Sequence, residues 1–157
     1  MVLMGQPGTG KTSFINTFLN RLLNINYKIK KKAKVIKANE DEIKIYEFKL
    51  QQDNIGLRII KTPGLQLDEK DQEIFVKLDN ILEKYPNINA ICITCPGSFV
   101  RLDDEKKLLY DKIIDFFGEN LYNNVLFLIT FSDSEPHFEK LKLFMKKNKP
   151  FTRTLVF

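Results

Sequence analysis

The chain has 157 residues, of which 43% are hydrophobic, and its formal net charge is +5 at pH 7. This composition is ordinary for one globular domain and argues against a disordered chain. No apolar run approaches the roughly 20 residues that a membrane-spanning helix needs, and no basic-then-apolar signal segment opens the chain, so we expect a cytoplasmic protein.

The first residues predict a strand, a glycine-rich loop and a helix. Val2-Leu3-Met4 is an apolar strand that is short against the usual length of about five residues. We therefore expect residues 1–157 to form a single domain that is a fragment, truncated at one or both ends. Apolar residues recur at helical spacing after the loop, which predicts a helix over about 11–23.

A basic stretch follows this helix, with six lysines at positions 28, 30, 31, 32, 34 and 37. Such a cluster could attract anionic lipid or nucleic acid. No aromatic residue except Tyr27 is interleaved with the lysines, so a solvated loop is the preferred interpretation and no nucleic-acid partner is expected. Membrane contact is expected only through regions outside this chain.

The remainder of the chain alternates between strands and helices. Apolar and polar residues alternate from residue 42, which predicts an antiparallel hairpin of strands 42–50 and 56–61 around a turn at 52–54. We then expect helices at about 68–85, 103–117 and 136–147, and strands at 90–94, 125–129 and 153–157. This alternation predicts an α/β fold of three layers.

Two features of the sequence have simpler interpretations than catalysis or metal binding. Cys92 and Cys95 form a C-x-x-C, but residues three apart on a strand point to opposite faces, and no second pair completes a zinc site. We interpret both as core residues. His137 has no partner in a recognisable motif and is interpreted as a surface histidine.

The segment Gly5-Gln6-Pro7-Gly8-Thr9-Gly10-Lys11-Thr12 matches the phosphate-loop motif G-x-x-x-x-G-K-S/T between a strand and a helix. Backbone N–H groups should curl around phosphates, Lys11 should reach the terminal phosphates, and the Thr12 hydroxyl should ligate Mg²⁺. Pro7 has no N–H to donate. The predicted nucleotide-binding residues of this segment are Gly5, Gly8, Thr9, Gly10, Lys11, Thr12 and Ser13.

Later motifs favour guanine over adenine. The loop also looks like those of AAA-type ATPases, but the Asp-Glu at a strand end that such ATPases need is absent. Thr62-Pro63-Gly64 ends a predicted strand where GTP-binding domains carry D-x-x-G, and Thr130-Phe131-Ser132-Asp133 resembles the guanine-reading N/T-K-x-D. We therefore predict that Gly64, Thr130 and Asp133 bind nucleotide. A helix N-cap ahead of Pro136 is the alternative role for Asp133.

Nearly the whole chain resembles the GTPase group that contains the immunity-associated GIMAP proteins, the septins and the chloroplast outer-membrane import receptors. The segments that carry the resemblance are the phosphate loop, 59–64, 101–118 and 126–133. It implies a P-loop NTPase G domain, with a mostly parallel sheet and one antiparallel edge strand at 42–51. It also implies GTP or GDP with Mg²⁺ as cofactors, and a homo-oligomer formed through the nucleotide face.

Lys61 is the largest departure from this pattern. It occupies the place of the acid in D-x-x-G that normally holds Mg²⁺ through a water. If its ammonium lay about 5 Å from Mg²⁺, an effective dielectric near 20 would give a repulsion of roughly 7 kcal/mol. Either Mg²⁺ is bound weakly, or Lys61 turns away, or it neutralises phosphate in place of the metal.

Two further departures bear on hydrolysis. No threonine lies between Thr17 and Thr62 to complete the Mg²⁺ shell, and Phe131 replaces the lysine of N/T-K-x-D, where its ring could stack on the base. Phosphoryl transfer depends on the metal and on positioning, so hydrolysis is expected to be impaired. Gln66 could orient a water and Arg101 could supply a charge, although an ordinary solvated role remains open for both.

Three functions follow from these observations. The first is a guanine-nucleotide-binding domain that is a slow or degenerate GTPase and acts as a nucleotide-dependent switch or assembly module. The second is a non-hydrolysing scaffold that keeps its nucleotide as a structural cofactor. The third is an ATPase.

Overall fold

The structure is a computed structural model, and it describes residues 1–23, 41–50, 55–97, 103–131 and 154–156. Several expectations lie outside these residues: the roles of Asp133, His137 and Arg101, the lysine-rich stretch 28–37, the turn 52–54 and the helix 136–147. The strands are β1 (Val2–Met4), β2 (Lys44–Leu50), β3 (Ile55–Lys61), β4 (Ile91–Pro96), β5 (Val125–Thr130) and β6 (Thr154–Val156). The helices are α1 (Lys11–Leu22), α2 (Glu69–Lys84), α3 (Asp104–Phe117) and the 3-10 helix η1 (Glu119–Asn124).

The strands form one six-stranded sheet in the order β2-β3-β1-β4-β5-β6. Strand β2 runs antiparallel to β3 at one edge, and the other neighbours are parallel. The mostly parallel sheet with one antiparallel edge strand is therefore confirmed, and so is the α/β class. Parallel neighbours place the carboxyl ends of β1, β3, β4 and β5 at one edge of the sheet, which is the usual position of a ligand site in such folds.

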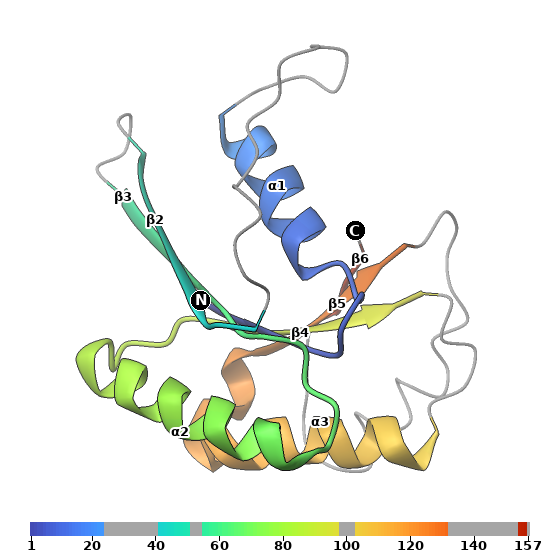
Figure 1. Cartoon of the computed structure of the whole chain (residues 1–157). Helices are drawn as coiled ribbons and strands as arrows, with labels where there is room; N and C mark the ends of the chain where they lie inside the picture. Colours follow the sequence, from blue (N-terminus) through green and yellow to red (C-terminus); the bar gives the residue numbers. More distant parts are fainter. Residues whose placement is uncertain (24–40, 51–54, 98–102, 132–153, 157) are drawn as a thin grey trace.

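Helices cover both faces of the sheet and make the three layers (Figure 1). Helix α1 packs on one face, while α2 and α3 pack on the other and contact each other through Phe75 and Phe116, whose ring centroids are 4.9 Å apart. Because successive strand side chains point to opposite faces, Leu3 joins the core on the α1 side and Met4 joins the core on the α2–α3 side. One core packs on each face of the sheet, so the loops at the strand ends extend from a rigid, layered frame.

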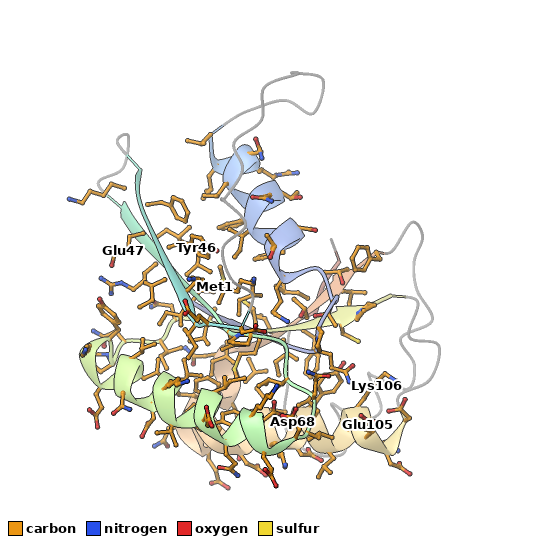
Figure 2. All side chains as sticks on the ribbon, in the orientation of Figure 1. Met1, Tyr46, Glu47, Asp68, Glu105 and Lys106 are labelled. Atoms are coloured by element: carbon orange, nitrogen blue, oxygen red, sulfur yellow. The ribbon has the colours of Figure 1, made fainter. Side chains whose placement is uncertain are left out.

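The edge hairpin follows the same alternation. Tyr46 of β2 points toward α1, and Glu47 points to the other side (Figure 2). Glu47 accepts a hydrogen bond from Arg58 Nε at 2.6 Å, and the Arg58 guanidinium lies 3.7 Å from the centre of the Tyr85 ring. These contacts tie the antiparallel strand to the end of α2. Among the described helices, none is long and apolar enough to cross a membrane.

The two cysteines lie in different cores, as the strand alternation predicts. Cys92 packs on the α1 side and Cys95 on the α2–α3 side, and both are buried free thiols. Burial raises the pKa of the Cys92 thiol to about 12, and it also raises the pKa of the Cys95 thiol. The prediction that both are core residues is confirmed.

We predict that neither thiol reacts with a water-soluble disulfide reagent in the native protein at pH 8. At a pKa of about 12 the thiolate fraction of Cys92 is about one part in ten thousand, and the thiolate is the reactive form. Labelling should be at least about a thousandfold slower than in guanidinium chloride, where both thiols become exposed. Rapid labelling of the folded chain would contradict the buried positions.

Candidate nucleotide-binding site

Three glycines give the segment between β1 and α1 its shape. Gly5, Gly8 and Gly10 have φ angles of 141°, 71° and 86°, which residues with a side chain rarely adopt. At Gly5 a second constraint applies, since a Cβ atom would lie 2.3 Å from the Thr94 hydroxyl oxygen. The glycine spacing of the motif is therefore required by backbone conformation and by close approach to β4.

Hydroxyl groups of three threonines hold this loop on the sheet. The Thr9 and Thr94 hydroxyl oxygens are 2.6 Å apart, and they lie within hydrogen-bond distance of Gln6 O and Met4 O respectively. The Thr130 hydroxyl, at the end of β5, donates to Thr9 O at 2.8 Å. The loop is thus bonded to both β4 and β5. The sequence reasoning missed Thr94, although a threonine between apolar residues near a strand end is a usable signal.

The Lys11 ammonium lies inside the loop. Its Nζ donates to Gly5 O and Gln6 O, each at 2.8 Å, and the residue is 6% exposed. Helix α1 begins immediately after the loop with Gly10 as its N-cap, and no side chain caps it. The N–H groups of the first turn and the positive end of the helix dipole therefore adjoin the lysine, an arrangement that attracts phosphate.

The loop that follows β3 packs directly against the phosphate loop. Leu65 N donates to Gly5 O at 3.1 Å, and a Cβ atom at Gly64 would lie 2.5 Å from Pro7 Cγ and 2.6 Å from Pro7 N. Glycine at position 64 is therefore required by contact between the two loops.

The buried carboxylate of Asp71 fixes the rest of this second loop to α2. It accepts hydrogen bonds from Gln66 N at 3.1 Å and Leu67 N at 2.8 Å, and Leu67 has a left-handed φ of 63°. Asp68 lies at the start of α2, where it caps the helix by accepting from Asp71 N at 3.2 Å (Figure 2). Helix α2 and the residues after Gly64 are thus one bonded unit.

A cavity of about 660 Å³ opens between these two loops, within the size range of small-molecule sites. Of the predicted residues, those that line it are Gly8, Thr9, Gly10, Lys11, Thr12, Ser13 and Gly64. Gly5 and Thr130 do not line it but support the loop from behind. Asp133 lies outside the described residues. The cavity also includes Asp41 and the start of α2, which sequence reasoning did not assign to the site.

Phe131 forms part of the cavity wall at the end of β5. Its side chain is 60% exposed and its φ is 54°, a conformation uncommon for a bulky residue. A Cβ atom at Gly10 would lie 3.3 Å from two carbons of the ring. The aromatic ring therefore stands beside the start of α1, where it can offer a face to a planar ligand.

The described residues do not fit a conventional Mg²⁺ site. Thr12 lines the cavity and could offer its hydroxyl, but Lys61 occupies the position of the second, acidic ligand and is only 7% exposed. In the described part of the chain, no group of three acidic, histidine or cysteine residues could hold a metal ion. Lys61 also lines the cavity, which favours a side chain that faces the site over one that turns away.

Comparison with known proteins gives a family and a fold. The model of the AIG1 family matches residues 1–156, and no curated protein sequence matches the chain. Toc33 from Arabidopsis thaliana in complex with GDP and Mg²⁺ is 14% identical, with a TM-score of 0.64 over 99% of this chain and 68% of Toc33. The same protein with Mg²⁺ and GMPPNP gives 14% identity and a TM-score of 0.60, with the same coverage.

A third solved structure comes from work on the chloroplast translocon components atToc33 and psToc159, for which dimerization is important for GTPase activity. It is 14% identical, with a TM-score of 0.67 over 99% of this chain and 67% of the matched chain. At this identity the three likenesses show the fold alone, and they confirm the G-domain architecture.

We predict that Gly64→Ala lowers GDP affinity by at least about tenfold. The added methyl group would meet backbone atoms of Pro7 at 2.6 and 2.7 Å, so the two loops must move apart. Gly56→Ala is the matched control, because Gly56 lies in the same strand-and-loop segment with open space around its Cβ position. Isothermal titration of both variants measures the difference, and an unchanged affinity for Gly64→Ala would show that the loop contact is dispensable.

Proposed function

Since the chain belongs to the AIG1 family, we propose that it binds GTP or GDP in the cavity between the two loops. We further propose that it is a slow or degenerate GTPase that acts as a nucleotide-dependent switch or assembly module. The observation that carries the proposal is the placement of the Lys11 ammonium, bonded to two loop carbonyls beside the uncapped start of α1. A lysine ammonium and a row of N–H groups that line one cavity are complementary to a polyphosphate.

Phe131 and Thr130 support a base site next to the phosphate site. Thr130 bonds the phosphate loop through Thr9 O, so the end of β5 and the loop are held in one geometry. The exposed ring of Phe131 extends the cavity from that point and would stack on the base. Recognition of guanine itself is assigned to Asp133, as the motif predicts.

Lys61 supports nucleotide binding more strongly than turnover. A cation beside Lys11 in the cavity favours a bound anion, but hydrolysis needs a metal that bridges the phosphates and a positioned water. The same observation favours a non-hydrolysing scaffold as the second candidate function. Gln66 lines the cavity and is the residue proposed to orient a water if turnover occurs.

We propose association through the nucleotide face as the mode of assembly. Among the structurally similar proteins, dimerization is important for the GTPase activity of atToc33 and psToc159. In this chain the cavity lies between loops at the edge of the sheet, with exposed Phe131 on its wall. A second copy could therefore cover the site. A cytoplasmic location stays a prediction.

The proposal is tested by titrating the purified chain with GDP, GTP, ADP and ATP. We expect guanine nucleotides to bind more tightly than adenine nucleotides. Lys11→Ala should lower the affinity for GDP by about ten- to a hundredfold, because hydrogen bonds to a charged group are lost. Arg21→Ala is the control, because it removes a cation near the other end of α1. Wild-type affinity in Lys11→Ala would refute the phosphate site, and tighter binding of ATP would favour the ATPase interpretation.

A separate variant tests the base site. Phe131→Ala should lower the affinity for GDP by about tenfold, because stacking of a base on an aromatic side chain contributes about 1–3 kcal/mol. Phe131→Tyr keeps the ring and should bind normally. Pyrophosphate has no base, so its affinity should be the same in all three proteins. An equal loss for GDP and pyrophosphate would mean that Phe131 supports the loop instead of the base.

A further inference from the structure

Lys61 is a largely buried lysine whose ammonium has no bonded partner in the described part of the chain. It ends β3, opposite Leu3 of β1 and Lys44 of β2, and it is 7% exposed on the wall of the cavity. Within the described part of the chain, no hydrogen bond or ion pair involves its ammonium. Among the described residues no side-chain nitrogen is both fully buried and unbonded, so the Lys61 ammonium keeps contact with open space, and on the cavity wall its charge attracts an anion.

In the described part of the chain, none of the carboxylates that line the same cavity forms an ion pair with Lys61. Asp68 caps α2, and Glu73 is exposed and pairs with Lys77 at 3.6 Å. The third, Asp41, is exposed. Lys44 lies directly opposite Lys61 and forms an ion pair with Glu42 at 2.8 Å. The nearby carboxylate of Glu42 is therefore paired with Lys44 and not with Lys61. The balancing charge is therefore best supplied by the ligand that enters the cavity.

The Lys61 ammonium has the same net charge as the Mg²⁺–carboxylate pair of a conventional metal site. A Mg²⁺ ion with one carboxylate near it carries a net charge of +1, and a lysine ammonium also carries +1. Together with Lys11, which lines the same cavity, either arrangement presents the same total charge to the phosphates. Addition of Mg²⁺ to the lysine site would instead place two cations side by side.

We propose that Lys61 is a second phosphate-binding lysine that takes the place of Mg²⁺, so that this chain binds nucleoside polyphosphates independently of a divalent cation. The inference rests on the proposed function, because it requires that the cavity binds a nucleotide. It concerns the ground-state complex and assigns Lys61 a binding role.

The test compares GDP affinity in excess MgCl₂ and in excess EDTA, by isothermal titration with nucleotide-free protein. The wild-type dissociation constant should change by less than about threefold between the two conditions. Lys61→Asp introduces a carboxylate into the cavity that Thr12 also lines, so its affinity should become at least about tenfold tighter with Mg²⁺ than with EDTA. Lys112→Asp is the matched control, since it makes the same charge change at an exposed position of α3 that does not line the cavity. Its affinity ratio should stay near that of the wild type.

Two further measurements keep the result clear if Lys61→Asp folds poorly. Lys61→Met keeps the apolar stem and removes the charge, and it should lose about tenfold in GDP affinity in both conditions. The paramagnetic resonance of Mn²⁺ gives a readout independent of affinity. Mn²⁺ should stay in its free, hydrated form when added to the wild-type GDP complex, and it should be immobilised by the Lys61→Asp complex.

The outcomes separate the two proposals. A wild-type affinity at least about tenfold tighter with Mg²⁺ than with EDTA would overturn the role of Lys61 and leave nucleotide binding intact. The proposed role of Lys61 would also be overturned if Lys61→Met bound GDP as tightly as the wild type does. Immobilised Mn²⁺ in the wild-type GDP complex would overturn it too. Absence of GDP and GTP binding in both conditions would refute the proposed function itself.

Discussion

The site depends on the contact between the phosphate loop and the ends of β4 and β5. A loop whose N–H groups turn inward leaves its carbonyl groups to be satisfied elsewhere, and unpaired buried carbonyl groups would destabilise it. Here Gln6 O, Thr9 O and Met4 O are all within bonding distance of threonine hydroxyls. The absence of a side chain at Gly5 lets Thr94 approach closely enough to join this network. These bonds hold the phosphate loop against β4 and β5.

A second consequence is that the phosphate loop and α2 are mechanically linked. Pro7 touches Gly64, and the residues after Gly64 are bonded to Asp71 of α2. A ligand that displaces the phosphate loop by a few tenths of an ångström must therefore move Gly64 or strain the contact. In the proposed nucleotide complex, this is the physical route by which the state of the terminal phosphate would reach the surface of α2. The buried Asp71 makes that route short, because it bonds the loop directly to the first turn of the helix.

Much of this arrangement could be predicted from the sequence, for identifiable reasons. The strand alternation assigned Cys92 and Cys95 to opposite cores, and the motif G-x-x-x-x-G-K-S/T located the loop, because both depend on local spacing. The partners Thr94 and Asp71 could not be predicted in the same way. Their roles arise from contacts between segments far apart in the chain, such as the 85 positions that separate Thr9 from Thr94. The sequence likewise left three alternatives for Lys61, and its position on the cavity wall argues against the one in which it turns away.

A lysine and a metal–carboxylate pair can carry equal charge and still differ in what they do for binding and for turnover. A lysine can neutralise the phosphates of a bound nucleotide as well as a metal–carboxylate pair does, because the net charge is the same. In the transition state, charge shifts between the leaving and transferred groups, and a metal that bridges the β- and γ-oxygens follows that shift at short distance. An ammonium binds through hydrogen bonds and cannot coordinate several oxygens in a fixed octahedral geometry. If Lys61 takes the place of the metal as proposed, it would preserve ground-state affinity and reduce transition-state stabilisation, the combination expected of a domain whose occupied site matters more than its rate of hydrolysis.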